Sequence, residues 1–390
     1  MTYPSRRAGL GALLAVSALL ATAAQSPAHT EKPEPWVRAW GSNAVGQLGN
    51  GATLDQQTPS AVRGLARDDV GELAGGGWPT TPFAVALLNN GTVQAWGDAS
   101  QGQLGDGTKA SRSYPAAVAG LSGVSEVAAG AVSAYAVRNG RVLGWGGNTY
   151  GQLGNGSTGA GGDRPVPVQS LNKVKDIAAG CNHVAALRED GSVWTWGRND
   201  QGQLGNGSTA SRDTPQRVAG LQVVVAVAAG CLHTLALTAD GTVKAWGRGA
   251  NGQLGIGTTA ASPVPVNVHS LDGVVGIVAG GHHNSALLDD GTVRAWGWNN
   301  AGQLGDGTKT DRTTPVPLPA LTGVKAMAGG WTHTLALLDD QTVVAWGDNA
   351  NGQLGDASTA SSLTPVTALP AGSGTTRVAA SLGWNSSYAY

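Results

Sequence analysis

The amino-acid sequence predicts an all-β fold, a seven-bladed β-propeller with four antiparallel strands in each blade. Three observations predict it: one unit recurs seven times, its period is nearly constant, and its apolar residues alternate with period two. Consecutive copies are 56, 49, 51, 50, 50 and 50 residues apart. A tryptophan followed by glycine marks the copies at Trp40, Trp96, Trp145, Trp196, Trp246, Trp296 and Trp346.

The copy at residues 174–218 shows why each unit should hold four strands. Its runs VKDIAA, HVAALR, SVWTWG and TPQRV alternate in polarity and are separated by turn or loop residues. Between the second and third runs we expect two-residue hairpin turns with positive φ at both positions. These turns are Asp190-Gly191, Asp240-Gly241 and Asp290-Gly291.

The two ends of the repeat region are predicted to complete one blade together. The region opens in mid-unit with WVRAWG at residues 36–41 and stops in mid-unit with RVAASLGWNSSYAY at 377–390. The C-terminal segment therefore supplies the two inner strands of the last blade, and the N-terminal segment supplies the two outer ones. Such closure holds both termini in place.

The unit V-x-x-I-A-x-G-x-x-H-T-L-A-L-x-x-D-G-x-V-x-A-W-G-x-N-x-x-G-Q-L-G resembles the repeat of the regulator of chromosome condensation family, over about residues 36–390. This resemblance implies a seven-bladed propeller. The founding member's guanine nucleotide exchange activity is the least favoured function here, because the N-terminus and the charge contradict its nuclear setting. The chain is more distantly similar to secreted propeller-type β-lactamase inhibitors, whose shorter repeats lack GQLG, so inhibition is not implied.

Residues 1–28 are expected to be a secretory signal peptide, which leaves 29–390 as a single propeller domain. Arg6 and Arg7 precede an apolar run that is too short for a membrane span, and cleavage is expected near Ala24 or Ala28. The general secretory and twin-arginine routes both stay open. We therefore expect a secreted, extracellular monomer without a membrane span.

The charge argues against nucleic acid as a partner. Without Arg6 and Arg7 the formal net charge changes from −1 to −3, and no basic stripe remains to neutralise phosphates. No GxSxG motif is present, and no nucleophile–base pair recurs. The sequence therefore predicts a protein that is not an enzyme and uses no cofactor or metal.

Several regular features are predicted to be structural. The GQLG glycines allow tight turns and its leucine packs between blades. Histidines at the start of the second strand are expected to cap turn backbones rather than bind metal, since equivalent positions fan around the ring. They are His183, His233, His283 and His333, and the tryptophans of the repeat units from Trp96 to Trp346 belong to the same structural class.

Cys181 and Cys231 occupy the same slot in neighbouring units. A disulfide needs Cα atoms within about 7 Å, and adjacent blades diverge from the axis. We therefore predict two free, buried thiols.

One binding site is predicted on the face that carries the first-to-second-strand turns and the GQLG loops. In AGGWTHTLAL, at residues 328–337, a tryptophan follows the glycine pair where sister units have Cys181, Cys231 or Gly281. Ring closure places three such tryptophans on consecutive blades, as an aromatic crescent, and clustered tryptophan is typical of binding hot spots. The predicted site residues are Trp78, Trp331 and Trp384, with Arg198, Arg248 and Trp298 on the rim. The alternative is that each tryptophan only plugs the channel.

Two classes of function remain. The first is a protein-binding scaffold, and the second is a carbohydrate or cell-wall binder that stacks tryptophan on sugar rings. The partner is expected to be an extracellular protein or a glycan.

Overall fold

The computed structural model describes residues 36–318, 321–383 and 385–390. Residues from Pro35 to Tyr390 form one compact unit. The predicted signal peptide and Trp384 lie outside the described residues. Within the described part of the chain, no helix is long and apolar enough to cross a membrane.

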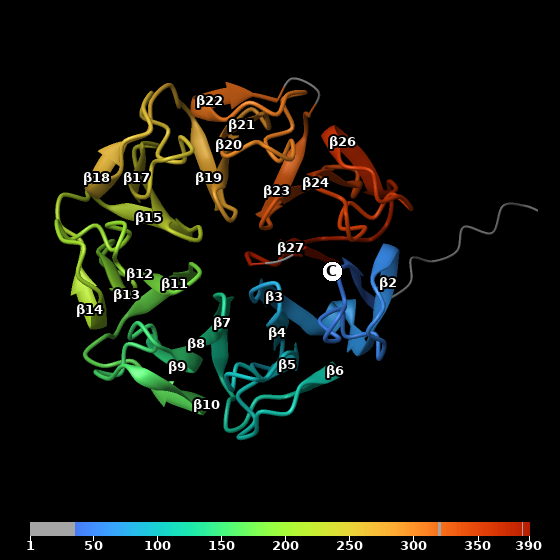
Figure 1. The fold of residues 1–390 in the computed structure, drawn as a ribbon, viewed down its shortest axis with the longest axis horizontal. Coiled ribbons are helices and arrows are strands. Elements are labelled where there is room, and N and C mark those ends of the chain that lie inside the picture. Colours follow the sequence, from blue (N-terminus) through green and yellow to red (C-terminus); the bar gives the residue numbers. More distant parts are fainter. Residues whose placement is uncertain (1–35, 319–320, 384) are drawn as a thin grey trace, which may run out of the picture. The chain divides into compact units, whose positions relative to one another are not determined.

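Seven four-stranded antiparallel sheets build this unit, which confirms the predicted fold class. Figure 1 shows them as blades around a central axis, each with its first strand innermost. Blade 1 contains β3 (Val70–Gly76), β4 (Phe83–Leu88), β5 (Val93–Gly97) and β6 (Arg112–Ala117). Blade 2 contains β7 (Val124–Ala129), β8 (Ser133–Arg138), β9 (Arg141–Asn148) and β10 (Gly159–Pro167). Blade 3 contains β11 (Val174–Ala179), β12 (His183–Arg188), β13 (Val193–Gly197) and β14 (Arg212–Arg217).

The remaining blades follow the same plan. Blade 4 contains β15 (Val224–Ala229), β16 (His233–Thr238), β17 (Val243–Gly247) and β18 (Ser262–Asn267). Blade 5 contains β19 (Val274–Ala279), β20 (His283–Leu288), β21 (Val293–Gly297) and β22 (Arg312–Pro317). Blade 6 contains β23 (Val324–Gly329), β24 (His333–Leu338), β25 (Val343–Gly347) and β26 (Ser362–Leu369).

Blade 7 is shared by the two ends of the chain, as the sequence predicts. It contains β27 (Val378–Ala380), β28 (Ser386–Ala389), β1 (Trp36–Gly41) and β2 (Gln56–Ala66), and the short 3-10 helix η1 (Arg67–Asp69) follows. β1 pairs with β28 in a continuous register from Arg38–Ala389 to Gly41–Ser386. The ring is therefore closed by backbone hydrogen bonds.

The hairpin between the second and third strands differs from the predicted two-residue turn. In blade 3, Gly191 donates its N–H to the carbonyl of Arg188 at 2.9 Å, and Arg188 donates to Ser192 at 3.0 Å. Gly191 has a φ of 76°, whereas Asp190 is not in the positive-φ region. The connection is thus a three-residue loop closed by a left-handed glycine. Asp190 instead accepts the Ser192 N–H on its carboxylate, at 3.0 Å.

Hydrophobic clusters fill the space between neighbouring blades. Leu104 of a GQLG loop in blade 1 packs with Trp145 of blade 2, and Leu254 of blade 4 packs with Trp296 of blade 5. The repeat tryptophans from Trp40 to Trp346 are fully buried. The GQLG leucines and these tryptophans thus pack between neighbouring blades.

The histidines link blades rather than capping turns. Each Nε2 lies within hydrogen-bond distance of a side-chain oxygen in the next blade: His183–Thr234 (2.9 Å), His233–Asn284 (2.7 Å), His283–Thr334 (2.9 Å) and His333–Ser387 (2.9 Å). The Thr234 hydroxyl donates in turn to the Gln203 carbonyl, which also accepts the indole N–H of Trp246. The Thr234 oxygen therefore accepts from His183, which fixes the Nε2–H tautomer.

This arrangement keeps the linking histidines uncharged. Burial lowers the pKa of His183 to about 3 and that of His333 to about 4. Among the described residues, no group of three His, Cys, Asp or Glu side chains could hold a metal ion. The four histidines thus provide hydrogen bonds between neighbouring blades.

Three carboxylates on consecutive innermost strands form a second set of links between blades. Glu72, Glu126 and Asp176 each accept a backbone N–H from the following blade, at 2.9, 2.9 and 3.2 Å. Burial raises the pKa of all three, and the carboxyls of Glu126 and Asp176 also hydrogen-bond to each other. Such a pair is stable when it holds one proton, because two buried carboxylates repel.

We expect Glu126→Gln to make the protein more resistant to alkaline conditions. A glutamate whose pKa is raised on folding contributes most below its ordinary value of 4.5 and loses that contribution as the pH rises. Glutamine mimics the protonated acid, so the variant should gain more than about 1 kcal/mol of unfolding free energy at pH 8, since one pKa unit equals 1.4 kcal/mol. Denaturant titrations at pH 5 and pH 8 measure the change. Glu189→Gln, in an exposed turn, is the control; a gain equal at both pH values contradicts the assignment.

Candidate functional site

The candidate site lies where the turns between the first and second strands converge on the axis. We call the residue directly after the glycine that follows each first strand the mouth residue. In the described chain these are Trp78, Ala131, Cys181, Cys231, Gly281 and Trp331. Backbone hydrogen bonds join neighbouring turns directly, for example Ala131 N–H to Cys181 carbonyl and Cys231 N–H to Gly281 carbonyl, both at 2.9 Å.

Trp78 and Trp331 meet across the mouth. Their ring centroids are 5.8 Å apart in an edge-to-face arrangement. Both pack against one apolar cluster that contains Ala131, Cys181 and Cys231, and both remain half-buried. The two rings therefore pack on the turns at this end of the axis and still offer surface to a partner. Gly281 makes room for this, because a Cβ there would lie 2.7 Å from the Trp331 ring.

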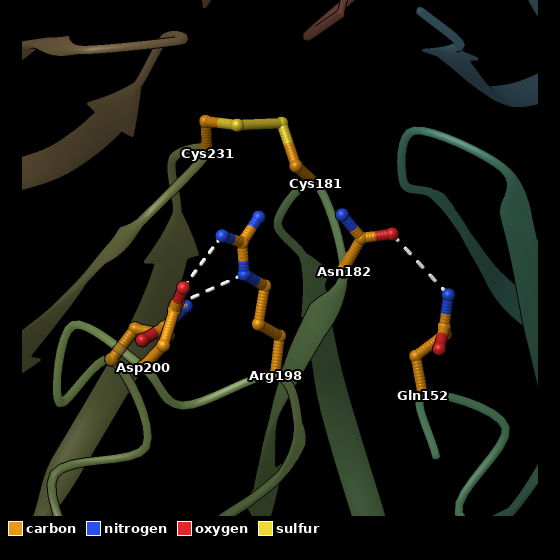
Figure 2. The surroundings of a disulfide bond; sticks show 7 residues. Gln152, Cys181, Asn182, Arg198, Asp200 and Cys231 are labelled. Atoms are coloured by element: carbon orange, nitrogen blue, oxygen red, sulfur yellow. Dashed lines mark hydrogen bonds and ion pairs between the residues drawn. A yellow bond between two sulfur atoms is a disulfide. The ribbon is translucent and has the colours of Figure 1, made fainter. Parts of the chain in front are cut away.

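Cys181 and Cys231 form a disulfide, so the prediction of two free thiols is wrong (Figure 2). Their Cα atoms are 4.4 Å apart. The blades do diverge outward, but the mouth residues sit at the axis, where neighbouring turns are within hydrogen-bonding distance. The cross-link joins blades 3 and 4 within the cluster against which the two tryptophans pack.

His282 extends the aromatic cluster toward blade 5. Its ring centroid lies 5.0 Å from that of Trp331 and 5.8 Å from that of Trp298. The side chain is only 8% exposed, and its Nδ1 is buried without a hydrogen-bond partner. Burial lowers the pKa of His282 to about 3, so the imidazole is neutral. His282 was not predicted from the sequence as a site residue, since there it is only the neighbour of the repeat histidine His283.

The two rim arginines differ in their surroundings. Arg198 is held by Asp200 through hydrogen bonds of 2.9 and 2.6 Å (Figure 2). Its guanidinium carbon also lies 5.1 Å from the Tyr150 ring centroid. Arg248 occupies the same slot one blade on, where the residue two positions later is Ala250. Its backbone N–H bonds to the Leu232 carbonyl of the adjacent mouth turn. Within the described residues its guanidinium has no hydrogen bond or ion pair.

The structure thus brings four of the six predicted site residues to one face around the mouth: Trp78, Trp331, Trp298 and Arg248. Arg198 lies on the same face but is engaged by Asp200. Trp384 lies outside the described residues. The arrangement combines tryptophan rings, a neutral imidazole and a guanidinium, which are groups that can stack on a ligand, hydrogen-bond to it and attract an anion.

A closed ring of seven four-stranded antiparallel blades defines a seven-bladed β-propeller. The chain belongs to the RCC1-like domain family, which matches residues 36–389. Propellers of this family often mediate protein interactions.

Solved structures show the same fold at low sequence identity. Human WBSCR16 superposes with a TM-score of 0.80 at 23% identity, over 91% of this chain and 98% of that one. Prp20p from Saccharomyces cerevisiae gives 0.79 at 24% identity, over 92% of each chain.

Curated relatives match over shorter stretches. The human E3 ubiquitin-protein ligase HERC2 is 34% identical over 116 residues, which is 29% of this chain and 2% of HERC2. The ultraviolet-B receptor UVR8 of Arabidopsis thaliana is 41% identical over 83 residues, which is 21% of this chain and 18% of UVR8. The chain therefore spans a small part of the curated relatives it matches.

Proposed function

We propose that this protein is a secreted, non-enzymatic scaffold that captures an extracellular partner protein through the face formed by the mouth turns and the GQLG loops. The supporting observation is the half-buried pair Trp78 and Trp331, held over a cross-linked base and continued by His282 and Trp298. Aromatic side chains that are fixed in place lose little conformational freedom on binding. The family's frequent role in protein interactions supports the same class of function.

Alanine at Trp78, Trp331 and Trp384 should abolish capture of the partner. Hot-spot tryptophans cost more than about 2 kcal/mol each when truncated, so the triple variant should lose well over a hundredfold in affinity. Immobilised protein is challenged with the secreted proteins of the source organism, and the captured protein is then titrated by calorimetry. Trp194→Ala, a half-buried tryptophan on β13 away from the mouth, is the matched control.

Two outcomes contradict this assignment. Undiminished binding by the triple variant places the binding site elsewhere. Unfolding of the variant assigns the tryptophans to packing, and the corresponding phenylalanine variants then separate packing from contact.

A carbohydrate or cell-wall ligand is the second candidate, supported by the same half-buried indole rings. Isolated cell walls and a glycan panel test it. Retention on either, with no protein captured, favours this alternative. Export is tested by N-terminal sequencing of protein from the medium, where a start near residue 25 or 29 is expected.

A further inference from the structure

We infer that Arg248 is a carboxylate-binding residue, and that the partner segment seated on the mouth is a peptide C-terminus whose last residue has an apolar side chain beside its α-carboxylate. This inference rests on the proposed function and specifies the chemistry of the partner. The structure carries it through three observations: an unpaired guanidinium, an aromatic surface next to it, and a buried imidazole nitrogen without a partner.

The unpaired guanidinium is a property of blade 4 rather than of the repeat. Blade 3 has the sequence Arg198-Asn199-Asp200, in which the aspartate neutralises the arginine at 2.6 Å. Blade 4 has Arg248-Gly249-Ala250 at the same positions. The acids that follow the tryptophan–glycine pair in blades 1 and 6 are already engaged: Asp98 accepts from Gln103 at 2.7 Å and Asp348 from Gln353 at 2.7 Å. Arg248 is thus left with capacity for an external anion.

The aromatic surface lies beside this charge. Arg248 and Trp298 occupy equivalent slots in neighbouring blades, and their backbone N–H groups donate to the Leu232 and His282 carbonyls of the mouth turns, both at 2.9 Å. The His282 ring in turn contacts the Trp331 and Trp298 rings. The neutral His282 adds no charge, so the guanidinium is the cation of this surface. Guanidinium groups bind carboxylates in bidentate fashion, and tryptophan rings next to them accommodate an apolar body.

The Nδ1 atom of His282 indicates which group of the ligand should lie beside the tryptophans. The His282 side chain is 8% exposed and its Nδ1 has no partner. The four linking histidines also have a buried Nδ1 without a partner, but the His282 ring is the one that contacts Trp331 and Trp298, where a ligand donor such as a peptide N–H would satisfy its Nδ1. A peptide supplies this donor, the carboxylate and the apolar side chain within one residue. A uronic sugar supplies the carboxylate but lacks the apolar side chain.

Two small probes test the inference without knowledge of the partner. N-acetylphenylalanine and N-acetylphenylalaninamide share the apolar body and the N–H, but only the first carries a carboxylate. Both are titrated into the full chain, with the indole N–H resonances of Trp331 and Trp298 followed by NMR. The acid should bind about tenfold more tightly than the amide, as expected for one charge-assisted hydrogen-bonded pair.

The chain itself offers matched variants. Ala250→Asp gives Arg248 the partner that Arg198 already has and should abolish the preference for the acid, as should Arg248→Gln. Arg198→Gln should leave the preference unchanged. Equal binding of acid and amide by the unmodified protein, binding of neither, or tighter binding of glucuronate would each overturn the inference. The proposed function fails separately, when the tryptophan variants still capture the partner protein.

Discussion

Deletion of residues 29–41 is expected to abolish cooperative folding. The deletion removes β1, which lies between β28 and β2 in the closing sheet. It also removes Trp40, which is fully buried with Leu335 and Leu354 of blade 6 and donates its indole N–H to the Gln353 carbonyl at 2.9 Å. Loss of one buried tryptophan alone costs about 3–5 kcal/mol. The remaining β27–β28 hairpin is marginal by itself, and the open ring exposes two sheet edges.

Thermal unfolding followed by circular dichroism and calorimetry measures this effect. A chain that starts at Pro35 keeps β1 intact and is the control, which should melt as a single transition. If the 29–41 deletion melts at the same temperature as the control, the pairing of β1 with β28 does not hold the ring closed.

The fold could be predicted because the repeat period and the alternation of apolar residues each restrict the architecture. Seven copies fix the number of blades, and the half-units at the two ends fix the closure. The hairpin turn could not be predicted from Asp-Gly alone. The same dipeptide serves a two-residue or a three-residue loop, and here the Asp190 side chain is used to accept the Ser192 N–H.

The role of the histidines could be predicted only in part from the sequence. Their spacing predicted structural rather than metal-binding residues, but the partner of each lies in the next repeat. His183 bonds to Thr234, the residue that follows the equivalent histidine in blade 4. The sequence did contain a sign of these links, because the residue after each histidine position of the next repeat has a side chain that can hydrogen-bond. These residues are Thr234, Asn284, Thr334 and Ser387.

The candidate site shows where sequence reasoning reaches its limit. The mouth tryptophans follow from register, because the repeats define equivalent positions. The distance between equivalent positions does not follow, since it depends on how far each lies from the axis. This is why Cys181 and Cys231, expected to be separated, are 4.4 Å apart between their Cα atoms. That the Arg248 guanidinium has no ion pair among the described residues likewise follows only from the structure around it.

Replacement of both cysteines by alanine is expected to destabilise the protein by about 2–4 kcal/mol, because the disulfide closes a long loop that spans 50 positions in sequence. Alanine suits this slot, since the native mouth residue of blade 2 is Ala131, which is 1% exposed in the same cluster. Denaturant titration measures the loss. Reductant should lower the stability of the unmodified protein equally and leave the variant unaffected. Denatured, unreduced protein should titrate with no free thiol, and detection of two would show that the cross-link does not form. A structural disulfide of this kind is stable in oxidising compartments, which agrees with the proposed export.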